Sequence, residues 1–494
     1  MQPIDRRTAL TLGGLGLLST AVGGGGLYWQ RPPSALDALT GVALQEPAVL
    51  RSQAGSLDVR LEAASGSHEV AGRKATTLGY NGGLPGPTLR LRPGDTLRIE
   101  LVNQLEQPTN LHVHGLHVSP DGNGDNVFVV VDPGDSFSYE YRLREDHPPG
   151  VYWYHPHHHG MVADQLFGGL YGAIIVEDTD PVAVSRDRVL VVSDISLDAA
   201  GRILTPSTME QMMGREGSLV LLNGQAAPVL EARPGERERW RVVNACSARY
   251  LSLRLEGQRV QLFGRDSGRP TESLDVEDVL LAPGNRADLI VTTRSGHSVL
   301  RAEQVDRGGM MGGMMGGMGG GSSSRSRRPV DLATFEVRGS PQTELAPLPP
   351  QNAPRDLRAS EVSRSRALTF QMGMGGGMMS GRGSQGMMSF TIDGNTFDAA
   401  RVDQAVTVGA IEEWTIRNDS PMDHPFHLHV WPMQLIADNG ESVDTPTWLD
   451  VVNVPARGQV TVRIAFDDYG GRTVYHCHIL DHEDRGMMGV VLAE

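Results

Sequence analysis

Apolar and polar residues alternate along much of the chain, with the period of two that is typical of β-strands. One such pattern appears three times: at 80–103, at 222–244 and, more weakly, at 392–398 followed by 407–418. Each copy predicts a strand, a tight turn at glycine or Pro-Gly, and a second strand. The copies lie too far apart for a solenoid. They therefore indicate three copies of one β-sandwich domain.

Length and composition agree with this pattern and narrow the choice of partners. A chain of 494 residues is too long for one ordinary core, and its length favours about three domains. Hydrophobic residues make up 39% and charged residues 21%, as expected of a globular protein. The net charge of −15 argues against nucleic acid as a partner, because such proteins carry a basic surface.

The N-terminal segment predicts export. Arg6 and Arg7 form a twin-arginine pair before an apolar, glycine-rich stretch at 9–27. Such a segment is typical of a bacterial twin-arginine signal that is removed from the mature protein. A retained membrane anchor is the alternative. Because no other stretch is long and apolar enough to cross a bilayer, we expect a periplasmic or secreted protein without stable membrane insertion.

A second similarity links only the first and third copies. Residues 150–155 resemble 471–476, and each segment leads into a His-x-His motif. The middle domain has no counterpart, so we expect a metal-free spacer. The predicted boundaries are 1–44 for the export signal and linker, 45–180 for the first domain, 181–340 for the second with a Met/Gly-rich segment, and 341–494 for the third with a Met/Gly-rich insertion.

Thirteen of the 16 histidines fall in four short clusters, at 111–117, 155–160, 424–429 and 476–482. On a strand, residues i and i+2 point to one face and lie roughly 6–7 Å apart. Each His-x-His therefore sends two imidazoles to one place. No single metal takes eight imidazoles, but three copper ions can share them. The eight are His112, His114, His155, His157, His427, His429, His476 and His478.

The cysteine between two of these histidines points to the opposite face. Cys477 is followed by His482 and Met487, and His424 lies three residues before His427. Two histidines, one cysteine and a weak axial methionine are the ligands of a blue-copper electron-transfer site. We therefore reject a disulfide between the two cysteines of the chain. Cys246 is expected to be a buried, small apolar residue.

These four motifs resemble those of the multicopper oxidase family, which includes laccases and periplasmic cuprous oxidases. The resemblance covers the chain from about residue 75 onward. It implies an all-β protein of three consecutive cupredoxin-like Greek-key β-sandwich domains with four copper ions. The implied ligands are His112 and His427 for type 2 copper, His114, His155, His157, His429, His476 and His478 for the type 3 pair, and His424, Cys477, His482 and Met487 for type 1 copper.

The same resemblance suggests two carboxylates that supply protons for reducing O2. Glu483 directly follows a ligand, where cuprous oxidases carry a proton-relaying glutamate. Asp125, in the segment DGNGDN, is our choice for the acid near the type 2 copper. Asp121 is the competitor, because the loop differs in length from that of familiar family members.

Methionines give the clue to the electron donor. Residues 308–321 contain only glycine and methionine, and 372–388 are also rich in both. Eleven of the 20 methionines lie in these stretches. Thioether sulfur prefers Cu(I), and cuprous oxidases carry a Met-rich insertion at this place. The glycine content argues against the helix such an insertion often forms, and a linker with incidental methionines is the alternative.

The sequence thus predicts an enzyme that couples four one-electron oxidations to the reduction of O2 to water, with Cu(I) as the donor in copper defence. A laccase that oxidises small phenolic or aromatic donors is the first alternative. A copper-storage protein and a structural protein of the cell envelope are the others. The sequence does not indicate an oligomeric state.

Overall fold

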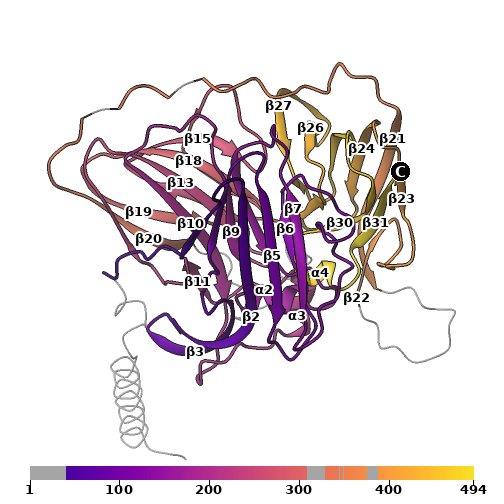
Figure 1. Cartoon of the computed structure of the whole chain (residues 1–494), viewed down its shortest axis with the longest axis horizontal. Coiled ribbons are helices and arrows are strands. Elements are labelled where there is room, and N and C mark those ends of the chain that lie inside the picture. Colours follow the sequence, from indigo (N-terminus) through magenta and orange to yellow (C-terminus); the bar gives the residue numbers. More distant parts are fainter. Residues whose placement is uncertain (1–40, 309–328, 344, 349, 375–387) are drawn as a thin grey trace, which may run out of the picture.

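A computed structural model describes residues 41–308, 329–343, 345–348, 350–374 and 388–494. Strands dominate these ranges and form six sheets, two in each of three successive sandwiches. In the view of Figure 1 the second sandwich lies at the left, the third at the right and the first between them. The expected all-β, three-domain architecture is confirmed. The export segment lies outside the described residues, and the domain boundaries stay predictions.

The first sandwich packs a sheet of order β1-β4-β9-β8-β6 against one of order β3-β2-β5-β7. One core of buried aliphatic residues and tyrosines joins them. Its strands are β1 (Val49–Arg51), β2 (Ser56–Val70), β3 (Arg73–Tyr80), β4 (Thr88–Leu91), β5 (Thr96–Asn103), β6 (His112–His114), β7 (Ser136–Arg142), β8 (Gly150–His155) and β9 (Gly172–Val176).

The second sandwich pairs the order β11-β10-β13-β18-β15-β16 with β12-β20-β19-β14-β17, again around its own core. Cys246 is buried in that core as a free thiol, as expected. The strands are β10 (Arg186–Ile195), β11 (Leu219–Leu222), β12 (Val229–Ala232), β13 (Arg237–Asn244), β14 (Leu251–Leu255), β15 (Arg259–Arg265), β16 (Leu274–Val276), β17 (Asp278–Leu281), β18 (Arg286–Thr292), β19 (Gly296–Glu303) and β20 (Val330–Val337).

The third sandwich pairs the order β22-β21-β24-β29-β26-β27 with β23-β31-β30-β25-β28. The strands are β21 (Arg364–Met374), β22 (Met388–Ile392), β23 (Gln404–Val406), β24 (Ile411–Asn418), β25 (His424–Leu428), β26 (Met433–Asp438), β27 (Glu441–Leu449), β28 (Val451–Val454), β29 (Gln459–Ala465), β30 (Gly471–Cys477) and β31 (Met488–Ala493).

The repeat found in the sequence forms the same structural unit in all three domains. Its second strand is β5, β13 or β24, and each strand ends in a buried asparagine, Asn103, Asn244 or Asn418. Each asparagine side chain donates to a backbone carbonyl of the loop that follows its strand and to one of a neighbouring segment. Because buried amides must find such partners, the residue fixes the loop that follows the strand.

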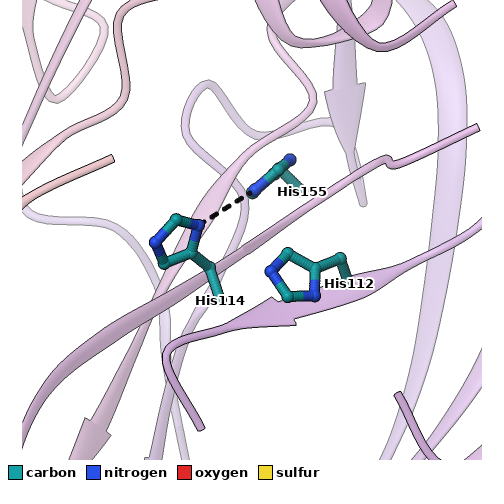
Figure 2. Close-up of side chains that lie close together, drawn as sticks. All are labelled: His112, His114 and His155. Atoms are coloured by element: carbon teal, nitrogen blue, oxygen red, sulfur yellow. Dashed lines mark hydrogen bonds between the residues drawn. The ribbon is translucent and has the colours of Figure 1, made fainter. Parts of the chain in front are cut away.

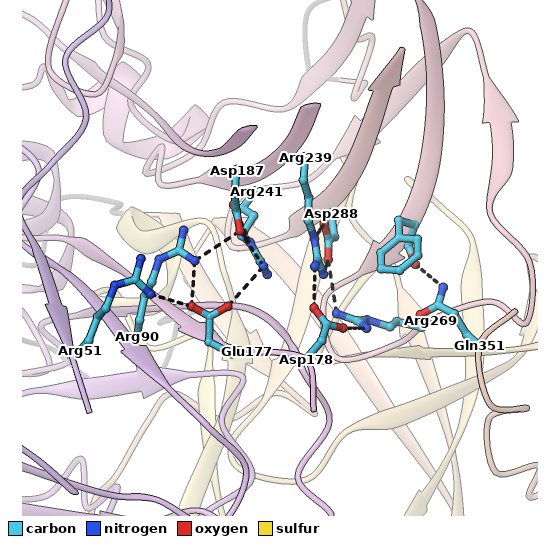
Figure 3. A network of polar contacts seen from close by, with 11 residues as sticks. Arg51, Arg90, Glu177, Asp178, Asp187, Arg239, Arg241, Arg269, Asp288 and Gln351 are labelled. Carbon is cyan, nitrogen blue, oxygen red and sulfur yellow. Dashed lines mark hydrogen bonds and ion pairs between the residues drawn. The ribbon is translucent and has the colours of Figure 1, made fainter. Parts of the chain in front are cut away.

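The domains are joined by an apolar cluster and by ion pairs. Residues of all three domains meet in the cluster, which extends from Trp153 through Val189 to Leu480. Beside it, arginines of β13 pair with acids from both sides of the boundary, as Figure 3 shows. Arg239, for example, lies 2.5 Å from both Asp178 and Asp288. These contacts make the relative placement of the domains part of the fold.

Three short helices lie in the described part of the chain: α2 (Val162–Gly168), α3 (Thr208–Met213) and α4 (Leu480–Glu483). They contact one another across the domain boundaries, α2 with α4 and α3 with α4. Among the residues described, no helix has the length and hydropathy needed to cross a membrane.

Candidate metal centres

The first-domain histidines are brought together by strand pairing. β6 runs antiparallel to β8, with His112 directly opposite His155. Figure 2 shows the imidazoles of His112, His114 and His155 grouped together. Nδ1 of His114 lies 3.4 Å from Nε2 of His155. His157 follows just after β8, and its backbone N–H donates to the side chain of Asn110.

The third domain repeats this arrangement. β25 runs antiparallel to β30, with His427 directly opposite His476. Nε2 of His429 lies 3.1 Å from Nε2 of His476. His478 follows β30, and its backbone N–H donates to the carbonyl of Pro425. Two His-x-His pairs thus converge in each of the two domains.

The two sets of histidines face each other across the domain boundary. Nε2 of His157 lies 3.1 Å from Nε2 of His476. Nε2 of His112 lies 3.4 Å from Nε2 of His427. All eight predicted imidazoles are buried, with no side chain more than a few per cent exposed. We call these eight residues the histidine cluster.

The histidine cluster fits a metal because its imidazoles are neutral, so each ring has one nitrogen with a free lone pair. Burial, and then the neighbouring imidazoles, hold the pKa of His112 far below its usual value. Burial lowers the pKa of His157 and His476 to about 4. Two of the neutral rings direct an N–H away from the cluster: Nδ1 of His427 donates to the carbonyl of Asp450, and Nδ1 of His476 donates to that of Cys477. The remaining lone pairs meet, an arrangement that a bound cation stabilises and that suits copper.

The second predicted site lies on the other side of β30. Nδ1 of His424 lies 3.3 Å from Sγ of Cys477, and Nδ1 of His482 lies 3.9 Å from it. Met487 is fully buried in the same core, and its backbone N–H donates to the carbonyl of His482. We call these four residues the thiol site. Burial raises the pKa of Cys477 far above its usual value, so a metal must displace the proton to bind sulfur.

Strand register explains why the two sites lie on opposite faces. Phe426 is paired with Cys477 one step from the pair of His427 with His476. Successive side chains alternate between faces. The thiol therefore enters the third-domain core, while the histidines on either side of it turn to the first domain.

Asp125, and not Asp121, lies against the histidine cluster. Both carboxylate oxygens of Asp125 are 2.9 Å from Nδ1 of His112, and one accepts the backbone N–H of Val113. Asp121 is exposed in the loop before it. Burial raises the pKa of Asp125 to about 8, against the lowering effect of the Val113 N–H.

Glu483 lies between two histidines of the cluster. Its carboxylate oxygens are 3.3 Å from Nε2 of His157 and 3.0 Å from Nδ1 of His476. Neither approach has hydrogen-bond geometry, so both oxygens lack a protein donor. Burial raises the pKa of Glu483 to about 7, against the lowering effect of His157.

Sequence reasoning missed Asp450. Its Oδ1 lies 3.1 Å from Nε2 of His114, and its backbone oxygen accepts from His427. The residue joins β27 to β28. The available signal was a single acid in the otherwise apolar segment from Trp448 to Val452, because a buried charge needs a partner that compensates it.

The methionines of α3 were missed as well. Met209, Met212 and Met213 lie on this middle-domain helix, which contacts α4. Nε2 of His482 lies 3.1 Å from the backbone oxygen of Met212. The M-x-x-M-M spacing was a signal, since residues three and four apart share a helix face.

The Met-rich stretches themselves lie almost entirely outside the described residues, but their flanks do not. Gly308 forms a β-bridge with Met422, two residues before His424. β21 and β22, which flank the second stretch, pair in register, and Phe390 of β22 stacks on the ring of His482 at 4.4 Å. Both stretches therefore begin beside the thiol site.

Comparison with known proteins identifies the family. Three models, each described as multicopper oxidase, match residues 62–181, 186–304 and 368–494. The chain belongs to the multicopper oxidase family, and it is an oxidoreductase. Membership implies copper as the cofactor and O2 as the oxidant.

Individual relatives match most of the chain. The multicopper oxidase mco of Staphylococcus haemolyticus is 28% identical over 429 residues, covering 84% of each chain. The cell division protein FtsP of Sodalis glossinidius is 28% identical over 477 residues, covering 93% of each. A solved multicopper oxidase of Campylobacter jejuni, described as a metallo-oxidase, is 29% identical. It covers 92% of this chain and 95% of that one, with a TM-score of 0.79. The expected cupredoxin-like sandwiches are thereby confirmed.

Proposed function

We propose that this protein is a cuprous oxidase. It oxidises four Cu(I) ions to Cu(II) while one O2 and four protons become two water molecules. His112 and His427 hold type 2 copper; the other six residues of the histidine cluster hold the type 3 pair; the thiol site holds type 1 copper. All twelve side chains are buried, which supports enclosed metal sites at both places.

Bound copper supplies one-electron transfer at the thiol site and four-electron reduction of O2 at the histidine cluster. The chain supplies the connection and the protons. Cys477 is bonded through the backbone to His476 and His478, so ligands of the two sites are adjacent in the chain. Glu483 and Asp125 stand against cluster histidines, where we assign them to hold and pass protons.

The observation that carries the choice of donor is the covering of His482. Its imidazole is fully buried, and the backbone of Met212 closes its outer nitrogen. A phenol therefore finds no exposed ring edge to contact. A small soft cation needs only thioether ligands nearby, and α3 offers three methionines. The solved relative described as a metallo-oxidase supports the same choice.

A laccase is the second candidate, because the thiol site would accept electrons from any donor that reached it. A storage role and a structural role in the cell envelope remain rivals of another class; one relative, FtsP, is named a cell division protein and not an oxidase. Twin-arginine export to the periplasm or the medium suits a copper-defence enzyme, and Arg6 and Arg7 support it.

Oxygen uptake with Cu(I), Fe(II) and a phenol, compared side by side, tests the proposal. The triple variant with Met209, Met212 and Met213 changed to leucine is expected to lower kcat/KM for Cu(I) about tenfold, about 1.4 kcal/mol of transition-state stabilisation. Phenol oxidation is expected not to fall. Met161→Leu, a partly buried methionine outside these groups, is the matched control.

The outcomes separate the rivals. Uptake with a phenol but not with Cu(I) identifies a laccase. Copper binding without oxygen uptake indicates storage, and neither copper binding nor uptake indicates an envelope role. An unchanged rate with Cu(I) in the triple variant would remove α3 from the donor site.

A further inference from the structure

The middle domain contributes a buried arginine beside the histidine cluster. Arg286 begins β18, and its side chain is fully buried. Its guanidinium leaves its own domain and binds Asp450 of the third domain with both Nη atoms, at 2.5 Å each. Its Nε donates to the carbonyl of Val151 in the first domain at 3.0 Å. One side chain thus joins all three domains.

The space around this guanidinium is shaped for it. Gly115, which follows His114, has a φ of +84°. A Cβ there would lie 2.4 Å from Nη2 of Arg286 and 2.8 Å from Oδ2 of Asp450. Gly284 offers its carbonyl to Nη1 at 3.2 Å, and Asp266 lies 3.2 Å from the same nitrogen. The first and third domains therefore close on a residue that neither of them supplies.

Asp450, whose two carboxylate oxygens are bound by Arg286, contacts two histidines of the cluster. Oδ1 lies 3.1 Å from Nε2 of His114, and the backbone oxygen lies 2.7 Å from Nδ1 of His427. A histidine that donates one nitrogen to an acceptor presents the other as a lone pair. His114 therefore presents Nδ1 to the cluster, whereas His427 presents Nε2.

This makes His114 an exception within the cluster. Nδ1 faces an oxygen outside the cluster in His112, His155 and His476, as it does in His427. Among the cluster rings that face such an oxygen, His114 is the one that faces it through Nε2. That acceptor is a carboxylate whose orientation the guanidinium sets.

We propose that Arg286 is a positioning residue for the trinuclear copper cluster. Acting through Asp450, it fixes the tautomer and orientation of His114 and the position of His427, so the middle domain is more than the metal-free spacer that its sequence suggests. The proposal rests on the assignment of the histidine cluster as the copper ligands.

The test uses the full-length, copper-loaded protein with Arg286→Lys and Arg286→Gln. Arg239→Lys is the matched control, because Arg239 is also buried, also binds two carboxylates across a domain boundary, and reaches no histidine. Loss of a hydrogen-bond partner of a metal-binding histidine weakens metal binding by about 10–100-fold. We expect at least about tenfold easier removal of type 2 copper by a chelator. We also expect a changed type 2 electron paramagnetic resonance spectrum, with the type 1 blue absorbance retained.

Unchanged type 2 copper in both Arg286 variants, or an equal loss in Arg239→Lys, overturns the proposal. Wild-type protein without type 2 copper would instead refute the proposed function. If the variants do not fold, nitrogen-15 resonances of histidine in the metal-free wild type decide. We expect one cluster ring, that of His114, to be protonated at Nε2, while other rings are protonated at Nδ1. Protonation of all the rings at Nδ1 overturns the proposal.

Discussion

Nε2 of His482 lies 3.1 Å from the backbone oxygen of Met212, so a middle-domain helix closes the outer edge of the thiol site. The residue directly after the helix, Gly214, has a φ of +75°. A Cβ at this glycine would lie 2.6 Å from Cγ2 of Ile479 and 2.7 Å from Cβ of Ala248. The position of α3 over His482 therefore requires a residue without a side chain at position 214.

Gly214→Ala is predicted to displace α3 and open the ring edge of His482. The ratio of kcat/KM for a phenol to that for Cu(I) is expected to rise about tenfold, measured by oxygen uptake. Gly82→Ala has a similar backbone strain, with φ of +68° and open space around it, and should leave the ratio unchanged. A ratio that stays constant in Gly214→Ala would contradict the gating role of α3.

Cys477→Ser is predicted to abolish the blue absorbance and the oxidase activity, because the thiolate is the ligand that defines such a site. The copper of the histidine cluster should remain, since the side chain of Cys477 points to the other face of β30. Copper analysis and absorbance spectra check both expectations. Cys246→Ser, a buried thiol of the second-domain core, is the control, and survival of the blue band in Cys477→Ser would refute the assignment.

Met487→Leu is predicted to raise the reduction potential of the thiol site. A weak axial donor stabilises the more positive copper state, and its removal favours the reduced state. Leucine keeps the packing volume of this fully buried residue. Redox titration of the blue band measures the shift, and Met433→Leu, also fully buried in the same core, controls for packing. A lowered potential would contradict the axial role.

Gly284→Ala is predicted to disturb the histidine cluster while sparing the thiol site. A Cβ at Gly284 would lie 3.0 Å from Nε2 of His478 and 3.1 Å from Cε1 of His114. Copper analysis should show loss from the cluster with the blue band retained. Gly134→Ala shares the strain, with φ of +86° against +88°, but meets open space. Equal copper loss in both variants would assign the effect to the backbone.

The metal-free protein is predicted to lose stability in acid. Burial lowers the pKa of His157 and His476 to about 4 and that of His424 to about 3. Between these values and 6.5 the folded form binds fewer protons than the unfolded form. Each such imidazole therefore removes about 1.4 kcal/mol of stability per pH unit as the pH falls below 6.5.

Two carboxyls act in the opposite direction. The raised pKa values of Glu483 and Asp125, about 7 and about 8, mean that the folded form keeps protons that the unfolded form has released. Their contribution is lost as the pH rises through those values. The Tm of the metal-free protein should thus be highest near pH 6.5, with a steeper fall on the acid side. Thermal unfolding from pH 4.5 to 8.5 measures this, and a Tm that rises below pH 6 would contradict it.

The histidines were predictable because their signal is local. In a His-x-His motif on a strand, the pleat alone directs both rings to one face, so His112 and His114 needed no tertiary information. Asp125 and Asp121 could not be separated in the same way, because the fold of a loop decides which acid reaches His112. Arg286 and Asp450 are 164 residues apart, and only the docking of domains brings them together. No sequence motif around either residue predicts that contact.

The pairing of His112 with His427 joins residues 315 positions apart in the sequence. A chain made from its N-terminus folds its domains in the same order, at about 5–20 residues per second. The first domain therefore waits some tens of seconds, with half of a binding site complete, before the other half exists. Copper that arrives in this interval meets the four imidazoles of the first domain but not Cys477. The order of synthesis thus favours loading after folding is finished, and the cell compartment in which folding ends decides when the enzyme can receive its metal.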